Sequence, residues 1–466
     1  MGGTKAGIAT TAILAVALGG CTALTPPKKK AAAVRISSDP YPSTYTRYPG
    51  VATMIRNVTI LDGEGGRIEG GSIAFAEGVV TAVGNASLAV PAGANVIDGT
   101  GKTVTPGIID VHSHLGDYPS PGVPAHDDGN EATAPARPEV WAEHSVWPQD
   151  PGFSRALANG GVTALQILPG SANLFGGRSV VLKNVQARTM QGMKFPGAPY
   201  GLKMACGENP KRVYGTKGGP ATRMGNIAVT RATFLKAKEY KTKWDKYDAD
   251  GGEMPSRDLA METLRGVLAG EIIVHNHCYR ADEMAIMIDL SKEMGYKIGT
   301  FHHAVEAYKI ADLLAANGTC AALWADWYGF KMESYDAVNE NIPLVHNAGA
   351  CAIVHSDDAN GIQRLNQEAA KALASGRRIG INVSDAVAWT WLSANPAKAL
   401  GIFDRTGSLK PGKMADVVLW NGNPLSVYTR PERVWIDGAL MYDSADPNRR
   451  PVSDFELGQP GEGDVK

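Results

Sequence analysis

Cysteine is scarce in this sequence, and neither sign of charge is in excess. Of 466 residues five are Cys, and no two of them form the Cys-x-x-Cys pair that a zinc ribbon requires. Lys and Arg total 46 and Asp and Glu total 47, so the net charge of -1 lacks the basic excess of a dedicated nucleic-acid binder. No G-x-S-x-G nucleophile elbow, P-loop or dinucleotide-binding fingerprint stands out. The sequence therefore excludes a zinc ribbon and disfavours nucleic-acid binding, serine hydrolysis and nucleotide binding.

The remaining composition is that of a globular protein with a large core. Hydrophobic residues make up 44% of the chain and charged residues 20%, which excludes a disordered polypeptide. At about 150 residues per domain the length predicts about three domains, or one α/β barrel that takes most of the chain.

The first 21 residues have the features of a secretory signal. Lys5 precedes an apolar run over 6–18, which is too short to span a bilayer as a mature helix. The following Leu18-Gly19-Gly20-Cys21 resembles a bacterial lipobox, in which the cysteine becomes the lipidated first residue of the mature chain. We therefore predict a signal peptide over 1–21, export across the bacterial inner membrane, and lipid anchoring in the periplasm or outer membrane. The alternative is a plain secretion signal cleaved nearby.

The segment 22–50 is predicted to be a tether between this anchor and the body of the protein. It has no apolar periodicity and contains Pro26-Pro27 and Lys28-Lys29-Lys30. The membrane contact expected of the protein is therefore the N-terminal lipid alone.

Four cysteines remain if Cys21 is lipidated. Each lies beside an apparent strand, and they are well separated along the chain: Cys206, Cys278, Cys320 and Cys351. We interpret them as small buried residues, although the predicted compartment would permit a disulfide.

Short β-type runs separated by Gly-rich turns occupy both ends of the body. The economical hypothesis is one small β-sandwich built from 51–105 and 401–445, followed by a tail over 446–466. The runs are Ala52–Ile60, Ser72–Phe75, Val79–Val83, Asn95–Ile97, Asp416–Trp420 and Arg433–Ile436.

The middle of the chain, 106–400, alternates buried strands with helix-like stretches. Eight strand candidates with helices between most of them predict an α/β fold, a (β/α)8 TIM barrel. The candidates are Ile108–Val111, Thr163–Leu168, Val180–Leu182, Leu202–Ala205, Ile272–Val274, Lys297–Phe301, Cys320–Leu323 and Ala352–Val354.

Histidines gather at the ends of four of these strands. Chemistry in such a barrel occurs where the strands end, and imidazole and carboxylate are ligands of Zn²⁺ and similar cations. In His-x-His both side chains point to one side, whereas adjacent residues point to opposite sides, so one of each adjacent pair is expected to bind. The sequence therefore predicts a metal site built from His112-Ser113-His114, His275-Asn276-His277, His302-His303 and His355-Ser356-Asp357-Asp358.

The segment Thr105–His114, with the sequence TPGIIDVHSH, resembles the signature of the amidohydrolase superfamily of metal-dependent hydrolases. Within it the chain looks closest to the branch of imidazolonepropionase-like proteins and Xaa-Pro-type dipeptidases. The segment Gly407–Asp416 resembles the return-strand motif of the split β-sandwich of that family. The resemblance covers about 50–445 and implies the same barrel and sandwich.

The resemblance also implies the metal ligands. His112 and His114 match the first-strand pair. Its pattern favours His275 over His277 in the fifth strand, and His303 over His302 in the sixth. In the eighth strand Asp357 matches the residue that touches the metal and also acts as general acid and base.

The fourth-strand ligand is open between two residues. Many members use a Lys there that is carboxylated by CO2 and bridges two metals, and Lys203 is the candidate. Some branches use a Glu, for which Glu208 is the candidate. A carboxylated Lys203 implies two metals, while Glu208 would also allow one.

The expected function is metal-dependent hydrolysis of an amide-type C–N bond in a dipeptide, an N-acyl amino acid or a cyclic amide. A divalent metal, expected to be Zn²⁺, makes hydroxide available at neutral pH, and Asp357 would pass the proton to the leaving nitrogen. His277 or His302 could stabilise the oxyanion or support a ligand. The alternatives are a deaminase or deacetylase on the same scaffold, or a non-catalytic surface lipoprotein that binds a ligand.

Few sequence features indicate the substrate, which is expected to be a small molecule or peptide. The long segment 115–150 could be a lid, and Trp324 and Trp327 could line an apolar pocket. Arg178 or Arg212 could bind a substrate carboxylate. The sequence leaves the oligomeric state open.

Overall fold

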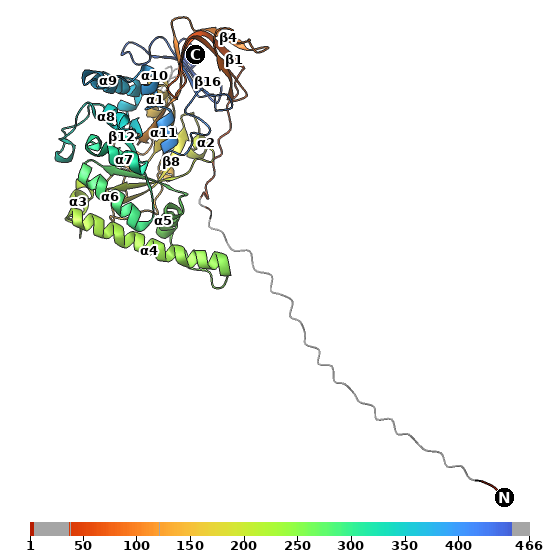
Figure 1. Ribbon diagram of the computed structural model, residues 1–466, viewed down its shortest axis with the longest axis vertical. Coiled ribbons are helices and arrows are strands. Elements are labelled where there is room, and N and C mark those ends of the chain that lie inside the picture. Colours follow the sequence, from red (N-terminus) through yellow and green to blue (C-terminus); the bar gives the residue numbers. More distant parts are fainter. Residues whose placement is uncertain (4–36, 38, 121, 450–466) are drawn as a thin grey trace.

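A computed structural model describes residues 1–3, 37, 39–120 and 122–449 (Figure 1). The predicted signal peptide with Cys21 lies almost wholly outside the described residues, as do most of the predicted tether and 450–466 of the predicted tail. No helix in the described part of the chain combines the length and the apolar character that crossing a bilayer requires.

The middle of the chain forms an eight-stranded sheet that nearly closes into a barrel of the TIM type. Its strands follow one another in sequence order around the sheet. The open seam is bridged by a backbone hydrogen bond from Asp357 N to His112 O, 3.0 Å. The strands are β6 (Ile108–Ser113), β7 (Val162–Ile167), β8 (Phe175–Lys183), β9 (Gly201–Ala205), β10 (Ile273–Cys278), β11 (Ile298–His303), β12 (Cys320–Leu323) and β13 (Ala352–Val354).

One strand of the barrel departs from the predicted regular alternation of strand and helix. β8 runs antiparallel to both β7 and β9, whereas the other neighbouring pairs are parallel. The reason is the short connection 168–174, because a parallel crossover needs a dozen or more residues. β8 therefore contributes its beginning, not its end, to the side of the barrel where the other strands end.

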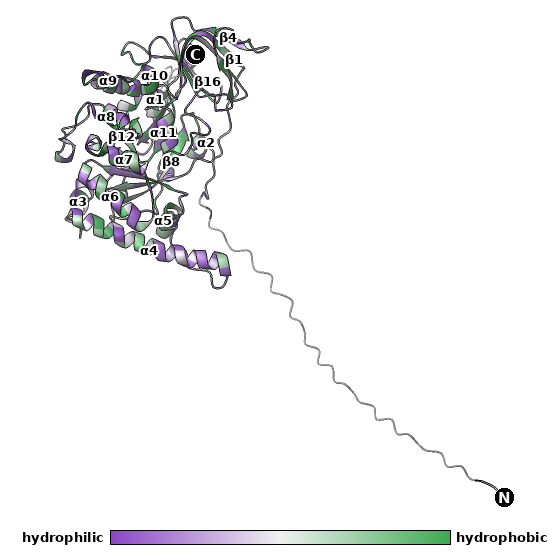
Figure 2. Ribbon diagram, in the orientation of Figure 1, coloured by the Kyte–Doolittle hydropathy of each residue, from purple (hydrophilic) through white to green (hydrophobic). Residues whose placement is uncertain are grey.

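Helices surround the barrel, and several begin and end at residues suited to capping. The side chain of Asp258 accepts hydrogen bonds from the first turn of α5, and Gly270 ends that helix with a left-handed backbone. Figure 2 shows hydrophilic residues predominating over the C-terminal half of the long helix α4. The helices are α1 (Pro151–Gly160), α2 (Met190–Met193), α3 (Glu208–Tyr214), α4 (Arg223–Asp250), α5 (Leu259–Ala269), α6 (Ala281–Met294), α7 (Ala311–Asn317), α8 (Asn341–Asn347), α9 (Leu365–Arg378), α10 (Asp385–Trp389) and α11 (Ala394–Ala399).

Both ends of the body join in a second sheet, drawn at the top of Figure 1. The antiparallel pairing of β5 with β14 links the N-terminal strands to the C-terminal ones. That this sheet folds as a sandwich stays a prediction. Its strands are β1 (Thr53–Leu61), β2 (Arg67–Ala76), β3 (Val79–Gly84), β4 (Asn95–Asp98), β5 (Thr103–Pro106), β14 (Val417–Trp420), β15 (Pro431–Ile436) and β16 (Ala439–Asp443).

The segment 39–50 of the predicted tether lies against the body. Tyr45 Oη donates to Asp437 Oδ2 at 2.6 Å, and Ser43 Oγ donates to the carbonyl oxygen of Lys194 at 2.6 Å. Asp39 forms an ion pair with Lys194 at 2.8 Å. This segment is therefore held by polar contacts to residues far along the chain.

The four cysteines of the body form two disulfides, so their interpretation as unpaired buried residues was wrong. Cys206 bonds to Cys278 and Cys320 to Cys351. Neighbouring strands bring each pair within reach, with Cα atoms 5.3 and 4.4 Å apart. The first disulfide lies where β9 and β10 end, and the second where β12 and β13 begin, at the opposite end of the barrel.

Candidate metal centre and active site

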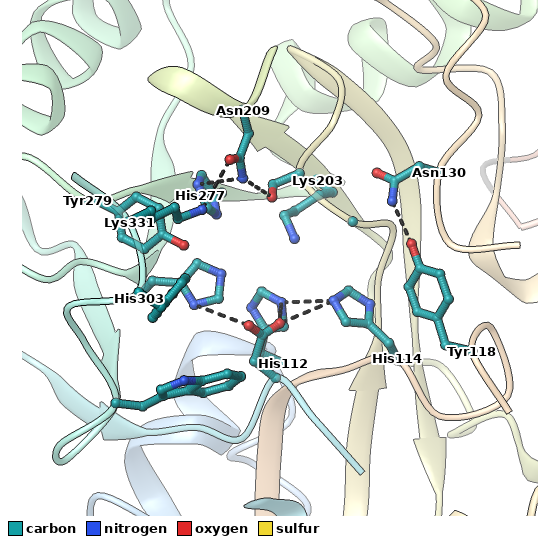
Figure 3. A pocket seen from close by; sticks show the side chains of 15 residues that line it. His112, His114, Tyr118, Asn130, Lys203, Asn209, His277, Tyr279, His303 and Lys331 are labelled. Atoms are coloured by element: carbon teal, nitrogen blue, oxygen red, sulfur yellow. Dashed lines mark hydrogen bonds and ion pairs between the residues drawn. The ribbon is translucent and has the colours of Figure 1, made fainter. Parts of the chain in front are cut away.

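A cavity of about 250 Å³ opens where the parallel barrel strands end (Figure 3). The ends of β6, β10 and β11, the middle of β9 and the loops between strands build its wall. It is lined by His112, His114, Tyr118, Asn130, Gly170, Ser171, Lys203, Asn209, His277, Tyr279, His303, Trp327, Phe330, Lys331 and Asp357.

His112 and His114 form one part of this wall. They lie two residues apart at the end of β6, so the alternation of a strand turns both rings to the same side. The Nδ1 atom of His114 lies 2.8 Å from the carbonyl oxygen of Leu168 and must donate to it. A neutral His114 ring therefore has a lone pair on Nε2, and that atom lies 3.3 Å from Nε2 of His112.

The carboxylate of Asp357 completes this group. Its Oδ1 atom lies 3.1 Å from His112 Nε2 and 3.3 Å from His114 Nε2. The lone pair on Nε2 of a neutral His114 repels the lone pairs of Asp357 Oδ1. These two atoms can lie this close only if a cation or a proton is between them. A second group of ligand atoms within 4.8 Å of one another belongs to His112, His303 and His355. This donor set of imidazole and carboxylate fits a divalent metal.

The charges of these side chains also suit a metal. Burial, and after it the positive Lys203, holds the pKa of His112 well below its ordinary value. Burial raises the pKa of Asp357, but the nearby His303 and His114 outweigh it and leave that pKa below its ordinary value. A cation would therefore meet an ionised carboxylate and at least one neutral ring with a free lone pair.

A chain of hydrogen-bonded rings supports His112 from within the barrel. His112 Nδ1 lies 2.8 Å from His302 Nδ1, and His302 Nε2 lies 2.9 Å from His275 Nδ1. Burial lowers the pKa of His302 well below its ordinary value and that of His275 to about 3, so both rings are neutral. When His112 donates from Nδ1, the chain can continue through His302 to His275 and leave the lone pair of His112 Nε2 free.

His277 and His303 form the wall opposite His114. Nδ1 of His277 is buried without a hydrogen-bond partner among the described residues, while Nε2 lies 3.4 Å from Asn209 Nδ2. His303 Nδ1 lies 3.9 Å from Asp357 Oδ2, and its ring stacks on Trp324 at 4.4 Å. Burial is the main cause of the low pKa of both imidazoles. Because Asn209 Nδ2 is a donor, Nε2 of the neutral His277 ring accepts this contact and Nδ1 carries the proton.

The backbone holds His303 and Asp357 in an unusual conformation. Their φ angles are 68° and 71°, in the left-handed region that residues other than Gly rarely adopt. Ser356, next to Asp357, donates from Oγ to the buried carboxylate of Asp110. Such backbone strain concentrates at functional sites, where the surrounding structure maintains it.

Lys203 projects from β9 into the cavity, and Glu208 does not. The Nζ atom of Lys203 donates to the carbonyl oxygen of Pro169 at 2.9 Å. Burial lowers the pKa of Lys203 to about 7, against the opposing influence of Asp357, so much of this amine is neutral near pH 7. Glu208 is the first residue of α3, outside the lining, with its carboxylate 3.9 Å from Lys331 Nζ.

The residues singled out from the sequence thus fall into two sets. His112, His114, Lys203, His277, His303 and Asp357 all line the cavity. His275, His302 and Glu208 lie outside its lining, the two histidines within the ring chain behind His112.

Among the residues proposed for the substrate, Trp327 lines the cavity and Arg178 does not. The Arg178 guanidinium lies 4.0 Å from the ring centroid of Trp141 and donates to Thr263 Oγ1. Tyr118 and Asn130 of the long segment 115–150 reach the cavity.

Sequence reasoning missed several lining residues. Asn209, Tyr279, Phe330 and Lys331 also reach the cavity. Tyr279 follows His277 by two residues, a spacing that could have indicated it. No periodicity marks Phe330 and Lys331, because they lie in the irregular loop between β12 and α8.

Comparisons with known proteins show which family the chain resembles. The model of the Amidohydrolase family matches residues 267–448. An amidohydrolase from Thermotoga maritima MSB8 of known structure is 36% identical with a TM-score of 0.77, and the match covers 84% of this chain and 100% of that one.

Two curated relatives are also similar. Amidohydrolase tasK from Hapsidospora irregularis is 33% identical over 398 residues, which are 80% of this chain, and this chain spans 40% of the length of that relative. Imidazolonepropionase from Mesorhizobium japonicum is 25% identical over 405 residues, 78% of this chain and 90% of that protein. Since the Thermotoga protein is matched along its full length at 36% identity, the chain belongs to the amidohydrolase superfamily and is a hydrolase.

Proposed function

We propose that this protein is a metal-dependent hydrolase that cleaves an amide-type C–N bond in a dipeptide, an N-acyl amino acid or a cyclic amide. One observation supports it above the others: Nε2 of His112, Nε2 of His114 and Oδ1 of Asp357 lie 3.1 to 3.3 Å from one another. Ligand atoms about 2.0–2.1 Å from a tetrahedral Zn²⁺ are separated by about 3.3 Å. The spacing of these three atoms is therefore that of zinc ligands.

The residues that would hold the metal are those at the cavity. They are His112, His114, His277, His303, Asp357 and Lys203. We favour His277 over His275 as the ligand from β10, because His277 lines the cavity whereas His275 lies outside its lining, with Nδ1 in contact with His302. We propose Zn²⁺ as the metal, with one or two ions per chain.

Lys203 would contribute as a carbamate. Its neutral amine, present because burial lowers the pKa to about 7, can add to the carbon of CO2 and lose a proton. The product is a carboxylate at the end of the Lys203 side chain, which provides two oxygen ligands where an ammonium provides none. This change would allow a second metal ion.

The chemistry divides between metal and protein. When bound, a divalent metal polarises the substrate carbonyl and lowers the pKa of a water to about 7. Asp357 would accept a proton from the attacking water on its carboxylate and deliver it to the leaving nitrogen. His302 would act as a positioning residue, since it orients His112 through its ring nitrogen.

Two further proposals concern the rest of the chain. We propose that the sheet formed from both ends folds as a β-sandwich.

We also propose that the protein is exported and anchored through a lipid on Cys21 in the periplasm or outer membrane. Mass spectrometry of the N-terminal peptide from the native host tests the anchor, because lipidation adds the mass of the acyl chains to Cys21.

The function is tested by offering the zinc-loaded protein a panel of dipeptides, N-acyl amino acids and cyclic amides. Turnover of at least one class, lost in Asp357→Asn, is the expected result. Release of ammonia alone would instead indicate a deaminase, and cleavage confined to acetyl groups, with no other N-acyl group, dipeptide or cyclic amide accepted, would indicate a deacetylase. Absence of both turnover and stoichiometric metal would indicate a ligand-binding protein and refute the proposal.

A further inference from the structure

We propose that Lys331 binds a carboxylate of the substrate, and that Trp327 and Phe330 contact an apolar group beside it. The substrate class is then an N-acyl amino acid or dipeptide with an apolar side chain next to a free carboxylate, rather than a neutral cyclic amide. This inference rests on the proposed hydrolysis of amides and narrows its substrates.

Lys331 presents its ammonium group at the cavity. It lies in the loop between β12 and α8, its side chain is 23% exposed, and it lines the cavity beside His277 and Tyr279 (Figure 3). Its Nζ atom lies 4.4 Å from the ring centroid of Tyr279, which steadies the cation over the ring face. The ammonium is thus held in place at the cavity.

The hydrogen-bonding capacity of Lys331 is only partly used. Among the described residues, Nζ donates to Asn209 Oδ1 at 3.1 Å, and the nearest Glu208 oxygen is 3.9 Å away, beyond hydrogen-bond distance. An ammonium has three N–H donors, so two remain for a ligand. A carboxylate accepts charge-assisted hydrogen bonds from such a cation, and these are stronger than hydrogen bonds between neutral groups.

The charges around the cavity favour an anionic substrate. Among the described residues that line it, Asp357 is the only carboxylate, and its Oδ1 is within 3.3 Å of His112 and His114. Lys331 lies on the other side of the cavity, next to His277 (Figure 3). A substrate carboxylate at Lys331 would leave the rest of the molecule directed at the metal-binding side chains.

A structural role for Lys331 explains less. Its ion pair with Glu208 spans 3.9 Å between side chains that are 23% and 27% exposed, and such pairs contribute little stability. An ion pair that only stabilised the fold would not require the Lys331 ammonium to lie at the cavity.

Aromatic residues adjoin Lys331 in the same loop. The rings of Trp327 and Phe330 are 5.6 Å apart, and the two residues are 42% and 49% exposed. Large aromatic side chains that remain exposed beside a cavity are typical of surfaces that contact a ligand. With a cavity of about 250 Å³ the apolar group must be small or extend over these rings.

The test compares acids with their carboxamides. The zinc-loaded full-length protein is assayed with N-acetylphenylalanine and Ala-Phe, and with N-acetylphenylalaninamide and Ala-Phe-amide, by release of acetate or alanine. The wild-type protein is expected to cleave each acid with a higher kcat/KM than the corresponding carboxamide, and the ratio of the two values measures its preference. In Lys331→Met this preference should fall by about 10- to 100-fold, mostly through KM, since a charge-assisted hydrogen bond is lost. Lys236→Met, at an exposed lysine of α4 outside the lining, is the matched control and should keep the preference.

A binding measurement keeps the test independent of turnover. Calorimetry with 3-phenylpropanoate and 3-phenylpropanamide should show that wild type prefers the acid and that Lys331→Met loses most of that preference. A preference that survives in Lys331→Met would assign the carboxylate to the metal and overturn the inference. Absence of turnover on every amide refutes the proposed function, whereas turnover without any acid preference overturns only this inference.

The aromatic contact has its own variant. Trp327→Ala should reduce the preference for Ala-Phe over Ala-Ala by about 10-fold, which corresponds to about 1.4 kcal/mol, because the Phe side chain then loses part of its apolar contact. An unchanged ratio would exclude Trp327 from the contact.

Discussion

Replacement of both Cys206 and Cys278 by Ala should destabilise the oxidised protein and also disturb the metal site. The disulfide joins residues 72 positions apart, and closing a loop of that length corresponds to about 4 kcal/mol in the chain-entropy treatment. It also connects the strand of Lys203 to the strand of His277, where Cys206 N donates to His277 O at 2.9 Å. We therefore expect a lower urea midpoint together with lower zinc content and lower kcat/KM.

The other disulfide provides the control. Cys320 and Cys351 are 31 positions apart, so their replacement by Ala should cost nearly as much stability, within about 1 kcal/mol. They lie where β12 and β13 begin, away from the cavity, and this variant should keep its zinc and its activity. Urea unfolding, metal analysis after gel filtration and steady-state kinetics are measured on both variants. Equal losses of zinc in the two variants, or none in the Cys206 and Cys278 variant, would refute the reasoning.

Three further predictions concern single side chains at the cavity. Asp357→Asn should lower kcat by about 10²- to 10⁴-fold with an unchanged circular dichroism spectrum, because an amide cannot take up the proton; near-normal turnover would defeat the assignment. Lys203→Ala should reduce the zinc content from two ions to one or none by elemental analysis, and unchanged stoichiometry would exclude Lys203 as a ligand. His277→Ala should weaken zinc affinity more than His275→Ala does, measured by competition with a chelating dye, and the reverse order would restore His275 as the ligand.

Much of the fold and of the candidate site follows from local patterns. Buried runs of apolar residues predict all eight barrel strands, because a strand covered on both faces needs no alternation. The side chains that follow such runs meet at one end of the barrel, which is why the histidines that end four strands could be expected to lie together with Asp357. The antiparallel direction of β8 depends on the short connection 168–174, and the buried apolar runs do not indicate it.

Other features depend on packing that a sequence does not display. His275 and His277 point to the same side of β10, so periodicity cannot separate them; their depth in the barrel does, because His275 meets His302 there. The pairing of the cysteines depends on which strands become neighbours. Lys331 could not be predicted, because an irregular loop carries it to the cavity.

The pairing of β5 with β14 bears on how this chain can be made. β14 follows the whole barrel in the sequence, so β5 can pair with it only after the barrel has been synthesised. Contacts between such distant parts of a chain form slowly. A product truncated before Val417 would leave one edge of β5 without its partner, an open template for association with other chains. Premature termination close to the C-terminus should therefore yield aggregates rather than a shortened enzyme.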